Sequence, residues 1–330
     1  MGYMKKAHGN DDRVNRKLDI LYKKSGIETR YSCLPDFTGN SHYHFYNGSQ
    51  TSVEKRLDKY AENALNLSLE SIEKCINGIN KKDITHLITV SCTGMSAPGL
   101  DIELVNALGL SSSVSRTSVN FMGCYAAIHA IKLAYAFCKA EKDANVLIVC
   151  TELCTLHFQK EPTDDNLLAN CLFSDGSAAL LISNTKKGFE IKEFYSEIHS
   201  RGANEMTWKI GSSGFLMGLS GIVPRVIKDV IKDFKTKSLT KMGWPQHSEI
   251  SYAIHPGGKK IVETIAEALE LKCTEAAVNI LKKYGNMSSA TILFVLQAIQ
   301  NTLSVNDSKV WGIAFGPGLV IESFGLEYVG

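Results

Sequence analysis

Residues Ser118 to Lys139, with the sequence SVNFMGCYAAIHAIKLAYAFCK, give the clearest indication of the fold of this 330-residue chain. Ser118 to Phe121 predicts a short strand, and Gly123 permits a sharp turn after it. From Cys124 onward the residues are apolar on nearly every side and rich in alanine, which is typical of a buried helix. We therefore expect a strand that turns into a buried helix, with Cys124 at the turn.

Apolar runs and amphipathic segments alternate on both sides of this unit. Further strands are predicted at 87–91, 145–151, 176–183, 189–199, 250–255, 309–314 and 319–324. Helices are predicted at 13–24, 53–79, 100–108, 223–234, 261–271, 276–284 and 289–300. This alternation indicates an α/β fold with a mostly parallel sheet. Two successive sets predict two similar halves, 1–185 and 186–330, stacked in α/β/α/β/α layers.

The composition is that of a globular protein with a sizeable core, since 44% of the residues are hydrophobic and 21% are charged. The net charge of +2 is too balanced to favour a nucleic acid or a membrane surface as partner. Nine irregularly spaced cysteines do not form a disulfide framework and indicate reduced thiols in a cytoplasmic protein. The polar segment 1–16 is not a signal peptide, and we expect no membrane span.

Cys124 is the first candidate for chemistry. A thiol at the positive end of a helix has a lowered pKa, which favours the nucleophilic thiolate. The apolar helix would place this thiol at the bottom of a pocket. The same residues also fit a buried structural cysteine, and on their own they do not separate the two interpretations.

His255 and Asn286 are the other two candidates. His255 ends a predicted strand before a Pro-Gly-Gly turn, and catalytic groups in open α/β sheets lie at such strand ends. A lone histidine there also fits a core residue bonded to a backbone carbonyl. Asn286 follows Gly285 between two predicted helices, where a simple turn asparagine is equally common.

The three residues together suggest one mechanism. His255 could pair with Cys124 and keep the thiol ionised. Its ring N–H and the Asn286 amide could then both donate to one thioester oxygen and stabilise the enolate that a malonyl thioester forms when it loses carbon dioxide. That enolate would attack an acyl group on Cys124 and form a carbon–carbon bond.

Four stretches resemble, in order and spacing, the signature stretches of type III polyketide synthases. They are Gly123-Cys124, IHPGG at 254–258, YGNMSSA at 284–290 and FGPG at 315–318. LFSDGSAA at 172–179 resembles a fifth, and 208–224 resembles the bacterial branch of the family more than the plant branch. The likeness extends from about Arg13 to the C-terminus.

The resemblance implies a thiolase fold, a homodimer and an enzyme that needs no cofactor beyond its CoA thioester substrates. Cys124 would be the nucleophile that carries the acyl-CoA starter. His255 and Asn286 would assist repeated decarboxylation and condensation of malonyl-CoA, and the chain would cyclise to a pyrone or phenolic product. Met217 and Cys154 suggest a tunnel for a fatty acyl starter, while a short starter or malonyl itself stays possible.

The resemblance also assigns the surrounding residues. Phe173 matches an aromatic gatekeeper, and the second gatekeeper position falls on Met217. Cys154 and His157 fall where residues of the cavity wall select the starter. The cyclisation pocket would be lined by Ser288, Gly316, Pro317 and Gly318. The residues at CoA-phosphate positions are Lys17, Lys24 and Lys260, which equally fit solvated surface charges.

Two departures from the family stand out. The chain lacks the family's opening strand, and Ala97 stands where a methionine often reaches into the partner's active site. Separately, Ser41-His-Tyr-His44 offers two possible metal ligands but is more typical of a polar loop, so we expect no metal site.

Two alternatives remain at this stage. A ketoacyl-acyl carrier protein synthase III-like enzyme shares the fold and a Cys-His-Asn triad, and it would need malonyl on a carrier protein. A non-catalytic thiolase-fold binding protein would show no enhanced reactivity at Cys124.

Overall fold

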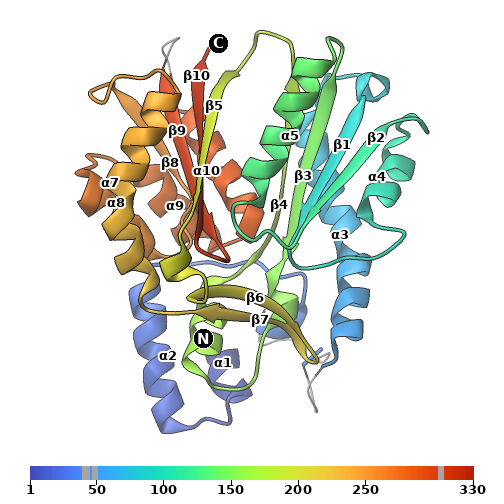
Figure 1. Ribbon diagram of the computed structural model, residues 1–330. Coiled ribbons are helices and arrows are strands. Elements are labelled where there is room, and N and C mark those ends of the chain that lie inside the picture. The colour runs from blue at the N-terminus through green and yellow to red at the C-terminus, as the bar shows by residue number, and fades with distance from the viewer. Residues whose placement is uncertain (39–44, 47–50, 304–307) are drawn as a thin grey trace.

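The computed structural model describes residues 1–38, 45–46, 51–303 and 308–330, and these form two β-sheets side by side (Figure 1). Helices lie between the sheets and on their outer faces. A smaller region of helices and one hairpin lies at one end of both sheets, where the N-terminus is also found.

The first sheet has the strand order β2-β1-β3-β4. Its strands are β1 (His86–Ser91), β2 (Ser115–Asn120), β3 (Asn145–Leu153) and β4 (Asp175–Ser183). β1 is parallel to β2 and β3, and β4 is antiparallel to β3. β1 and β3 are buried along almost their whole length because helices cover both of their faces. The outer face is covered by α3 (Val53–Cys75) and α4 (Leu100–Leu108).

The second sheet has the order β5-β10-β9-β8. Its strands are β5 (Phe189–Ile198), β8 (Ile250–Ile254), β9 (Lys309–Gly316) and β10 (Val320–Tyr328). β8 is parallel to β9, and the other two pairs are antiparallel. Its outer face is covered by α7 (Val223–Lys241) and α8 (Lys259–Leu269).

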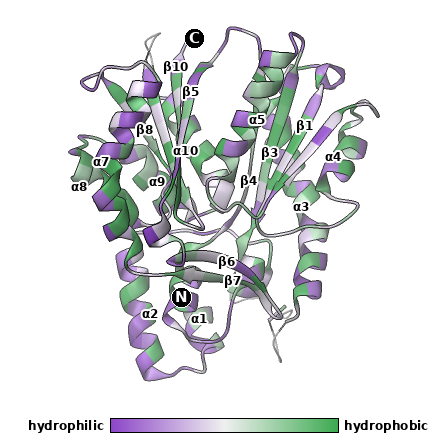
Figure 2. Ribbon diagram, in the orientation of Figure 1, coloured by the Kyte–Doolittle hydropathy of each residue, from purple (hydrophilic) through white to green (hydrophobic). Residues whose placement is uncertain are grey.

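Two apolar helices form the middle layer, α5 (Ala126–Ala140) and α10 (Thr291–Gln300). Both contact strands of both sheets, and one hydrophobic core joins them to the sheets. Figure 2 shows this interior as predominantly hydrophobic. Small residues such as Ala127 and Ala130 are fully buried and allow the layers to approach closely. The predicted α/β/α/β/α arrangement is therefore confirmed.

The prediction of a mostly parallel sheet was wrong. Three strand pairs in the two sheets are parallel and three are antiparallel. Hydrophobic periodicity does not indicate whether two strands run parallel or antiparallel. The length of the segment that connects them does, because a parallel pair needs a long crossover. β9 and β10 are joined by a turn at 317–319, which is too short for the crossover that a parallel pair needs.

Several elements beside the sheets escaped the sequence analysis. These are α1 (Gly2–Ala7), α6 (Asp164–Leu172), and the hairpin of β6 (Met206–Gly211) and β7 (Gly214–Leu219). The helix predicted at 289–300 is a short turn, η5 (Ser288–Ala290), followed by α10. Predicted elements with shifted bounds are α2 (Asp12–Ser25) and α9 (Glu275–Tyr284), while α3 ends earlier and α7 later than expected. α5 begins at Ala126, two residues after Cys124.

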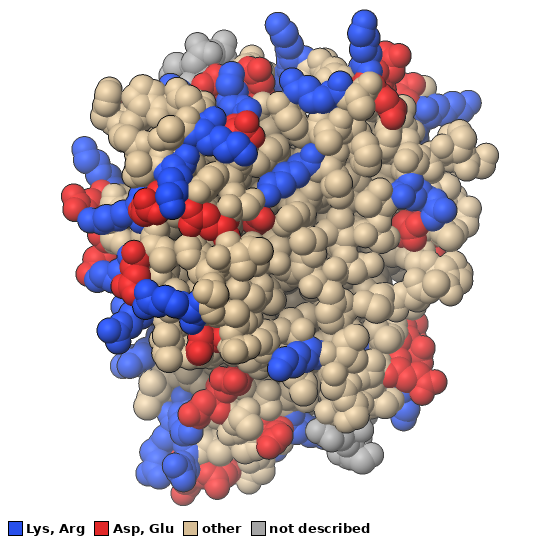
Figure 3. Space-filling view, viewed as in Figure 1, with Lys and Arg blue, Asp and Glu red and all other residues tan. Residues whose placement is uncertain are grey.

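The face shown in Figure 3 carries Lys, Arg, Asp and Glu side chains of both signs, scattered around a largely uncharged centre. No single-sign patch dominates this face. Within the described ranges, no helix combines the length and the hydrophobicity needed to cross a bilayer.

Candidate active site

Cys124 lies in the turn between β2 and α5, and its side chain is buried. The turn depends on Gly123, whose φ is +83°, in the left-handed region that favours glycine. A Cβ on Gly123 would also lie 2.2 Å from Cδ of Pro317. The sharp turn predicted from the sequence is therefore fixed by backbone conformation and by close packing. It leaves Sγ of Cys124 3.8 Å from Oγ of Ser288.

The sequence analysis predicted an ionised thiolate at Cys124, whereas the structure favours the neutral thiol. Burial raises the pKa of the Cys124 thiol to about 12, and the nearby Glu152 adds to this effect. Hydrogen bonds from Ser288 and Asn286 act in the opposite direction but do not offset burial. The N-terminus of α5 would lower this pKa, but α5 begins only at Ala126, two residues after Cys124. Desolvation of the thiolate therefore has the larger effect on the pKa. The resting thiol is thus protonated.

His255 follows β8, and its backbone N–H donates to the carbonyl of Ile313 at 2.8 Å. The imidazole is only 1% exposed, and burial lowers its pKa to about 3. Neither ring nitrogen has a hydrogen-bond partner among the described residues. A buried imidazole without partners is costly in a purely structural role, so the core-histidine interpretation is disfavoured.

Asn286 is held by backbone bonds on both sides. Its N–H donates to the Leu172 carbonyl at 2.9 Å, and its carbonyl accepts from the N–H of Ser174 at 2.9 Å. Its side-chain Oδ1 accepts from the N–H of Ser288 at 2.9 Å, and Nδ2 donates to the Gly257 carbonyl at 3.2 Å. Since an amide nitrogen carries two protons, the second one is available to face Cys124 in the cavity.

Cys124, His255 and Asn286 line one cavity of about 300 Å³. They come from the β2–α5 turn, the end of β8 and the α9–α10 connection, so the two sheets each contribute to it. The cavity wall is mostly apolar and includes Leu172, Val223 and Phe315. The three residues that the sequence analysis singled out are therefore brought together.

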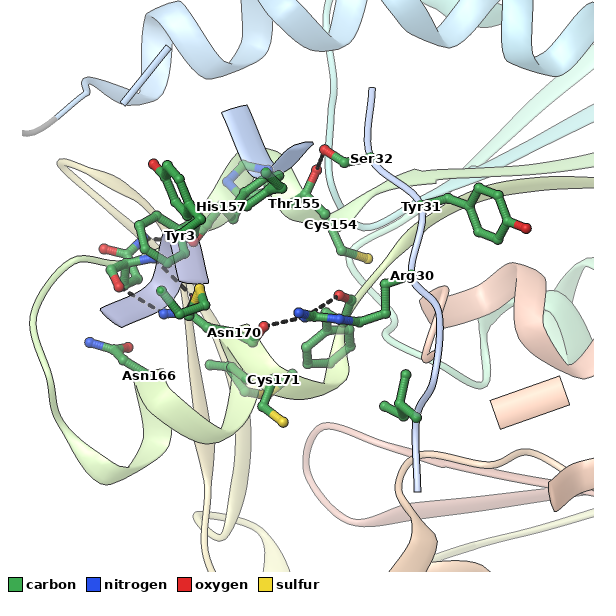
Figure 4. Close-up of a pocket in the computed structure, with 18 of the residues that line it drawn as sticks. Tyr3, Arg30, Tyr31, Ser32, Cys154, Thr155, His157, Asn166, Asn170 and Cys171 are labelled. Carbon is green, nitrogen blue, oxygen red and sulfur yellow. Dashed lines mark hydrogen bonds between the residues drawn. The ribbon is translucent and has the colours of Figure 1, made fainter. Parts of the chain in front are cut away.

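Phe173 and Met217 stand between this cavity and a second one of about 380 Å³, since both residues line both spaces. Figure 4 shows the second cavity, with Cys154, His157, Cys171 and Tyr3 around it. Its wall is tied together by Arg30, which donates to the carbonyl of Asn170.

His157 is part of an aromatic wall. Its ring stacks on Phe215 with centroids 4.0 Å apart, and both of its nitrogens are hydrogen-bonded, one with the Thr93 carbonyl and the other with the Phe215 N–H. Burial lowers its pKa to about 3. Trp208 meets this stack edge-on and donates from Nε1 to the Cys92 carbonyl at 2.7 Å.

The residues expected in the cyclisation pocket lie beside Cys124. Ser288 and Pro317 line a narrow space that Cys124, Cys154 and Trp208 also share. A Cβ on Gly316 would lie 2.4 Å from the Tyr125 ring, so Gly316 packs behind the nucleophile. Gly318 has a φ of +80° and donates to the Met206 carbonyl at 2.9 Å, which joins this loop to the β6–β7 hairpin.

The three lysines separate into two groups. Lys24 and Lys260 line the cavity that contains Cys124. Lys17 instead pairs with Asp164 at 2.5 Å on the surface. Ala97 is exposed, and His42 and His44 lie outside the described residues. Among the residues that the structure does describe, no group of His, Cys, Asp and Glu is arranged to hold a metal.

Glu152 is a fully buried carboxylate that the sequence analysis missed. It accepts hydrogen bonds from the Cys92 N–H at 2.9 Å, Thr93 Oγ1 at 2.8 Å and Ser289 Oγ at 2.5 Å. Burial raises its pKa. The signal was present, because Glu152 is the one charged residue in the apolar run from Val146 to Leu153.

Comparison with known proteins gives consistent matches over the whole chain. Residues 1–185 match the N-terminal domain, and residues 190–330 the C-terminal domain, of chalcone and stilbene synthases. The chain is 31% identical over 331 residues to "Probable polyketide synthase 1" of Dictyostelium discoideum, covering 96% of this chain but only 10% of that protein. It is 29% identical over 328 residues to "Alpha-pyrone synthesis polyketide synthase-like Pks18" of Mycobacterium tuberculosis, covering 95% of this chain and 82% of that protein.

Solved structures of type III polyketide synthases also superimpose closely on this chain. The C-terminal type III polyketide synthase domain of Steely1 from Dictyostelium superimposes with a TM-score of 0.90 at 28% identity, over 99% of this chain and 94% of that one. PKS-I from the brown alga Ectocarpus siliculosus gives 0.91 at 28% identity, over 99% and 93%. These matches in both halves of the chain support neither a ketoacyl-acyl carrier protein synthase III-like enzyme nor a non-catalytic binding protein. The chain belongs to the chalcone and stilbene synthase family, and it shares its fold with solved type III polyketide synthases.

Proposed function

We propose that this chain loads an acyl group from acyl-CoA onto Cys124 and extends it with malonyl-CoA, using His255 and Asn286. In this proposal residues 1–185 supply the nucleophile and residues 186–330 supply the two donors. The carrying observation is that a buried thiol, an imidazole with two unbonded nitrogens in the described structure and a carboxamide line one cavity.

The loading step needs a base. The Cys124 thiol and the His255 imidazole are both neutral in the structure, since burial raises one pKa and lowers the other. As sulfur attacks the thioester carbonyl of the starter, its proton passes to His255. The CoA thiolate leaves and takes that proton, so His255 returns to its neutral form.

The extension step needs hydrogen-bond donors. A malonyl thioester in the cavity loses carbon dioxide, and the electron pair of the broken carbon–carbon bond becomes an enolate. An N–H of His255 and Nδ2 of Asn286 donate to the enolate oxygen. The apolar wall at Phe173 disfavours the charged carboxylate and so favours its loss. The enolate carbon then attacks the acyl carbonyl and breaks its bond to sulfur, so that Cys124 leaves as the thiolate and takes a proton from water.

The surrounding residues take supporting parts in this proposal. Phe173 and Met217 gate the passage, while Cys154 and His157 shape the starter site. Ser288 and the loop 316–318 guide cyclisation to a pyrone or phenolic product. Lys24 and Lys260 bind CoA phosphates, and the ion pair with Asp164 argues against this role for Lys17. A homodimer, a cytoplasmic location and the absence of a cofactor remain predictions.

The test is incubation of the purified protein with labelled malonyl-CoA and a panel of acyl-CoA starters, with products identified by mass spectrometry. We expect extended, cyclised products from at least one starter and none from a Cys124→Ala variant. A Cys150→Ala variant is a matched control, because it removes a buried thiol that lines neither cavity. Extension by Cys124→Ala at the normal rate would refute the proposal.

A further inference from the structure

The second cavity, of about 380 Å³, has a size typical of small-molecule sites and adjoins the cavity that contains Cys124. Phe173 and Met217 line both spaces, so the passage that they gate leads from the thiol into the second cavity. Phe158 and Phe215 contribute to an aromatic wall there. A starter on Cys124 that is too long for the first cavity would therefore extend along this wall.

Arg30 brings a positive charge to the wall of the second cavity (Figure 4). It is half-buried, and no carboxylate lies within ion-pair distance of it among the described residues. Glu28 is the one acidic residue in the described lining of the cavity, and it pairs instead with Lys282 at 3.0 Å. Because removing a charge from water is costly, a cation in such a place ordinarily has a counter-ion. Arg30 has none in the described structure.

The guanidinium of Arg30 has more donors than the protein uses. Nη1 donates to the carbonyls of Asn170 and Phe173, and Nη2 donates to the hydroxyl of Tyr22 at 2.7 Å. Since a guanidinium carries five N–H groups, Nε–H and one N–H of Nη2 remain. The Tyr22 hydroxyl accepts from Arg30, so its own proton is available to a ligand. Tyr22 and Arg30 thus offer three donors to the same cavity.

These donors are held in position by close packing. Gly285 lies so near Arg30 that a Cβ on Gly285 would be 2.9 Å from Cγ of Arg30. The guanidinium carbon lies 5.2 Å from the centroid of the Tyr22 ring. The neighbouring side chain of Asn170, in contrast, is engaged with the N–H and the carbonyl of Gln159. A ligand would therefore meet donors that are already oriented, which lowers the cost of binding.

We propose that Arg30 and Tyr22 bind a carboxylate at the far end of the starter, so that the preferred starters are CoA thioesters of dicarboxylic acids. This site depends on the proposed function, because the starter must be carried by Cys124. The carboxylate oxygens accept from the remaining N–H groups of Arg30 and from the Tyr22 hydroxyl, and arginine suits such a two-oxygen partner. The methylene chain lies along the aromatic wall. The carboxylate supplies the missing counter-ion.

The same donors disfavour a starter that ends in a methyl group. Such a starter displaces water from Arg30 and Tyr22 without giving them an acceptor, and it leaves a desolvated charge unpaired. A site that is built to form hydrogen bonds discriminates strongly against a ligand that lacks the matching group. The second cavity therefore selects for charge at the end of the starter.

The test compares starters of equal length, namely hexanedioyl-, octanedioyl- and decanedioyl-CoA against hexanoyl-, octanoyl- and decanoyl-CoA. Binding is measured by calorimetry with Cys124→Ala, which has no thiol to acylate at that position, so affinity does not depend on turnover. We expect the diacid thioester to bind at least about tenfold more tightly than its matched partner for at least one length. Equal or weaker binding of the diacid series at every length would overturn the proposal.

Variants in the same Cys124→Ala background assign the preference to particular residues. Arg30→Gln should abolish the preference, and Tyr22→Phe, which keeps the ring, should reduce it about three- to tenfold. Arg201→Gln is the matched control, because it removes an exposed arginine that pairs with Asp229. A preference that survives Arg30→Gln would overturn the proposal.

Arg30→Lys gives a second measurement if Arg30→Gln does not fold. It keeps the charge but loses the planar fork, so it should weaken binding of the diacid series and leave the other series unchanged. Equal weakening of both series would overturn the proposal.

Turnover by the unaltered protein separates this proposal from the proposed function. Extension of both series with equal kcat/KM would refute the carboxylate site alone. Preferential binding of the diacid series, with no extension of any starter, would refute the proposed function and support the carboxylate site.

Discussion

Gly123 and Pro317 lie in contact across the active-site turn, so that a Cβ on Gly123 would come within 2.2 Å of Pro317 Cδ. Gly123→Ala should therefore abolish extension and lower the free energy of unfolding by well over the roughly 1 kcal/mol that a left-handed alanine costs. Gly243→Ala is the matched control, because Gly243 has a φ of +70° and open space around it. Urea unfolding and product formation measure both effects. Equal losses in the two variants would contradict the packing argument.

The parts of the fold that were predicted correctly depend on local patterns. β1 and β3 are short apolar runs, and α5 is an apolar helix behind a glycine turn, so each is written in adjacent residues. The β6–β7 hairpin was missed because its residues are mixed in polarity and mostly half-buried. α6 was missed because it is short and begins with Asp-Asp-Asn.

Cys124, His255 and Asn286 line one cavity, as the sequence suggested, while their catalytic roles stay predictions and burial disfavours the ionised thiol expected at Cys124. Motif order identified Cys124, His255 and Asn286, although spacing alone could not show that they meet. The thiolate was expected because Cys124 was predicted to lie at the N-terminus of a helix and beside the imidazole of His255. Both features were inferred from local sequence. Burial depends on the whole fold, and it acts in the opposite direction on the thiol. Glu152 was missed for the same reason, because its hydrogen-bond partners come from two segments that are distant from it in the sequence.

Asn286→Asp should separate loading from extension. The substitution replaces the Nδ2 donor with a carboxylate oxygen next to the developing enolate, while Cys124 and His255 are untouched. We expect malonyl-CoA decarboxylation to fall by about 10²–10³, the usual loss for one such donor. Intact-protein mass spectrometry should still detect acylated Cys124. Loss of both steps in a folded variant would mean that Asn286 acts earlier than we propose.

His255→Gln should slow the loading step itself. Without the imidazole, the proton of a thiol with a pKa of about 12 loses its proposed acceptor. Alkylation of Cys124 by iodoacetamide at pH 7 should fall at least about tenfold, as expected for loss of a general base. The exposed Cys273 serves as an internal reference in the same sample. An unchanged ratio of the two rates would exclude His255 as the base.

Lys24 and Lys260 should affect substrate binding rather than chemistry. Alanine at both positions removes two of the three lysines that line the cavity and leaves Lys259. We expect KM for acyl-CoA to rise about three- to tenfold with little change in kcat, because the contacts are to the remote phosphates. Lys17→Ala is the control and should leave KM unchanged, since its partner is Asp164. A KM effect of Lys17→Ala alone would reverse this assignment.

Trp208 should limit the length of the product. Its indole lines the narrow space beside Cys124 and also the second cavity of about 380 Å³. Trp208→Ala joins these spaces and should permit longer acyl starters or additional extensions. Trp208→Phe keeps a ring there and loses only the bond to the Cys92 carbonyl, so its products should stay the same. Product masses from the two variants decide the matter, and identical products from Trp208→Ala would place the limit elsewhere.

His157 should make the protein sensitive to acid. Its pKa is lowered to about 3 in the folded state, against about 6.5 in the unfolded chain. Between these values the unfolded state binds the additional proton, so this contribution to stability is complete above pH 6.5 and is lost as the pH falls toward 3. Asp175, whose pKa is raised to about 6, acts in the opposite sense. The measurement is therefore a difference: urea unfolding at pH 7 and pH 5 for the unaltered protein and for His157→Gln. His157→Gln should lose less stability than the unaltered protein over this interval, by about 1.4 kcal/mol per pH unit for one proton. Equal losses would show that His157 titrates normally in the folded state.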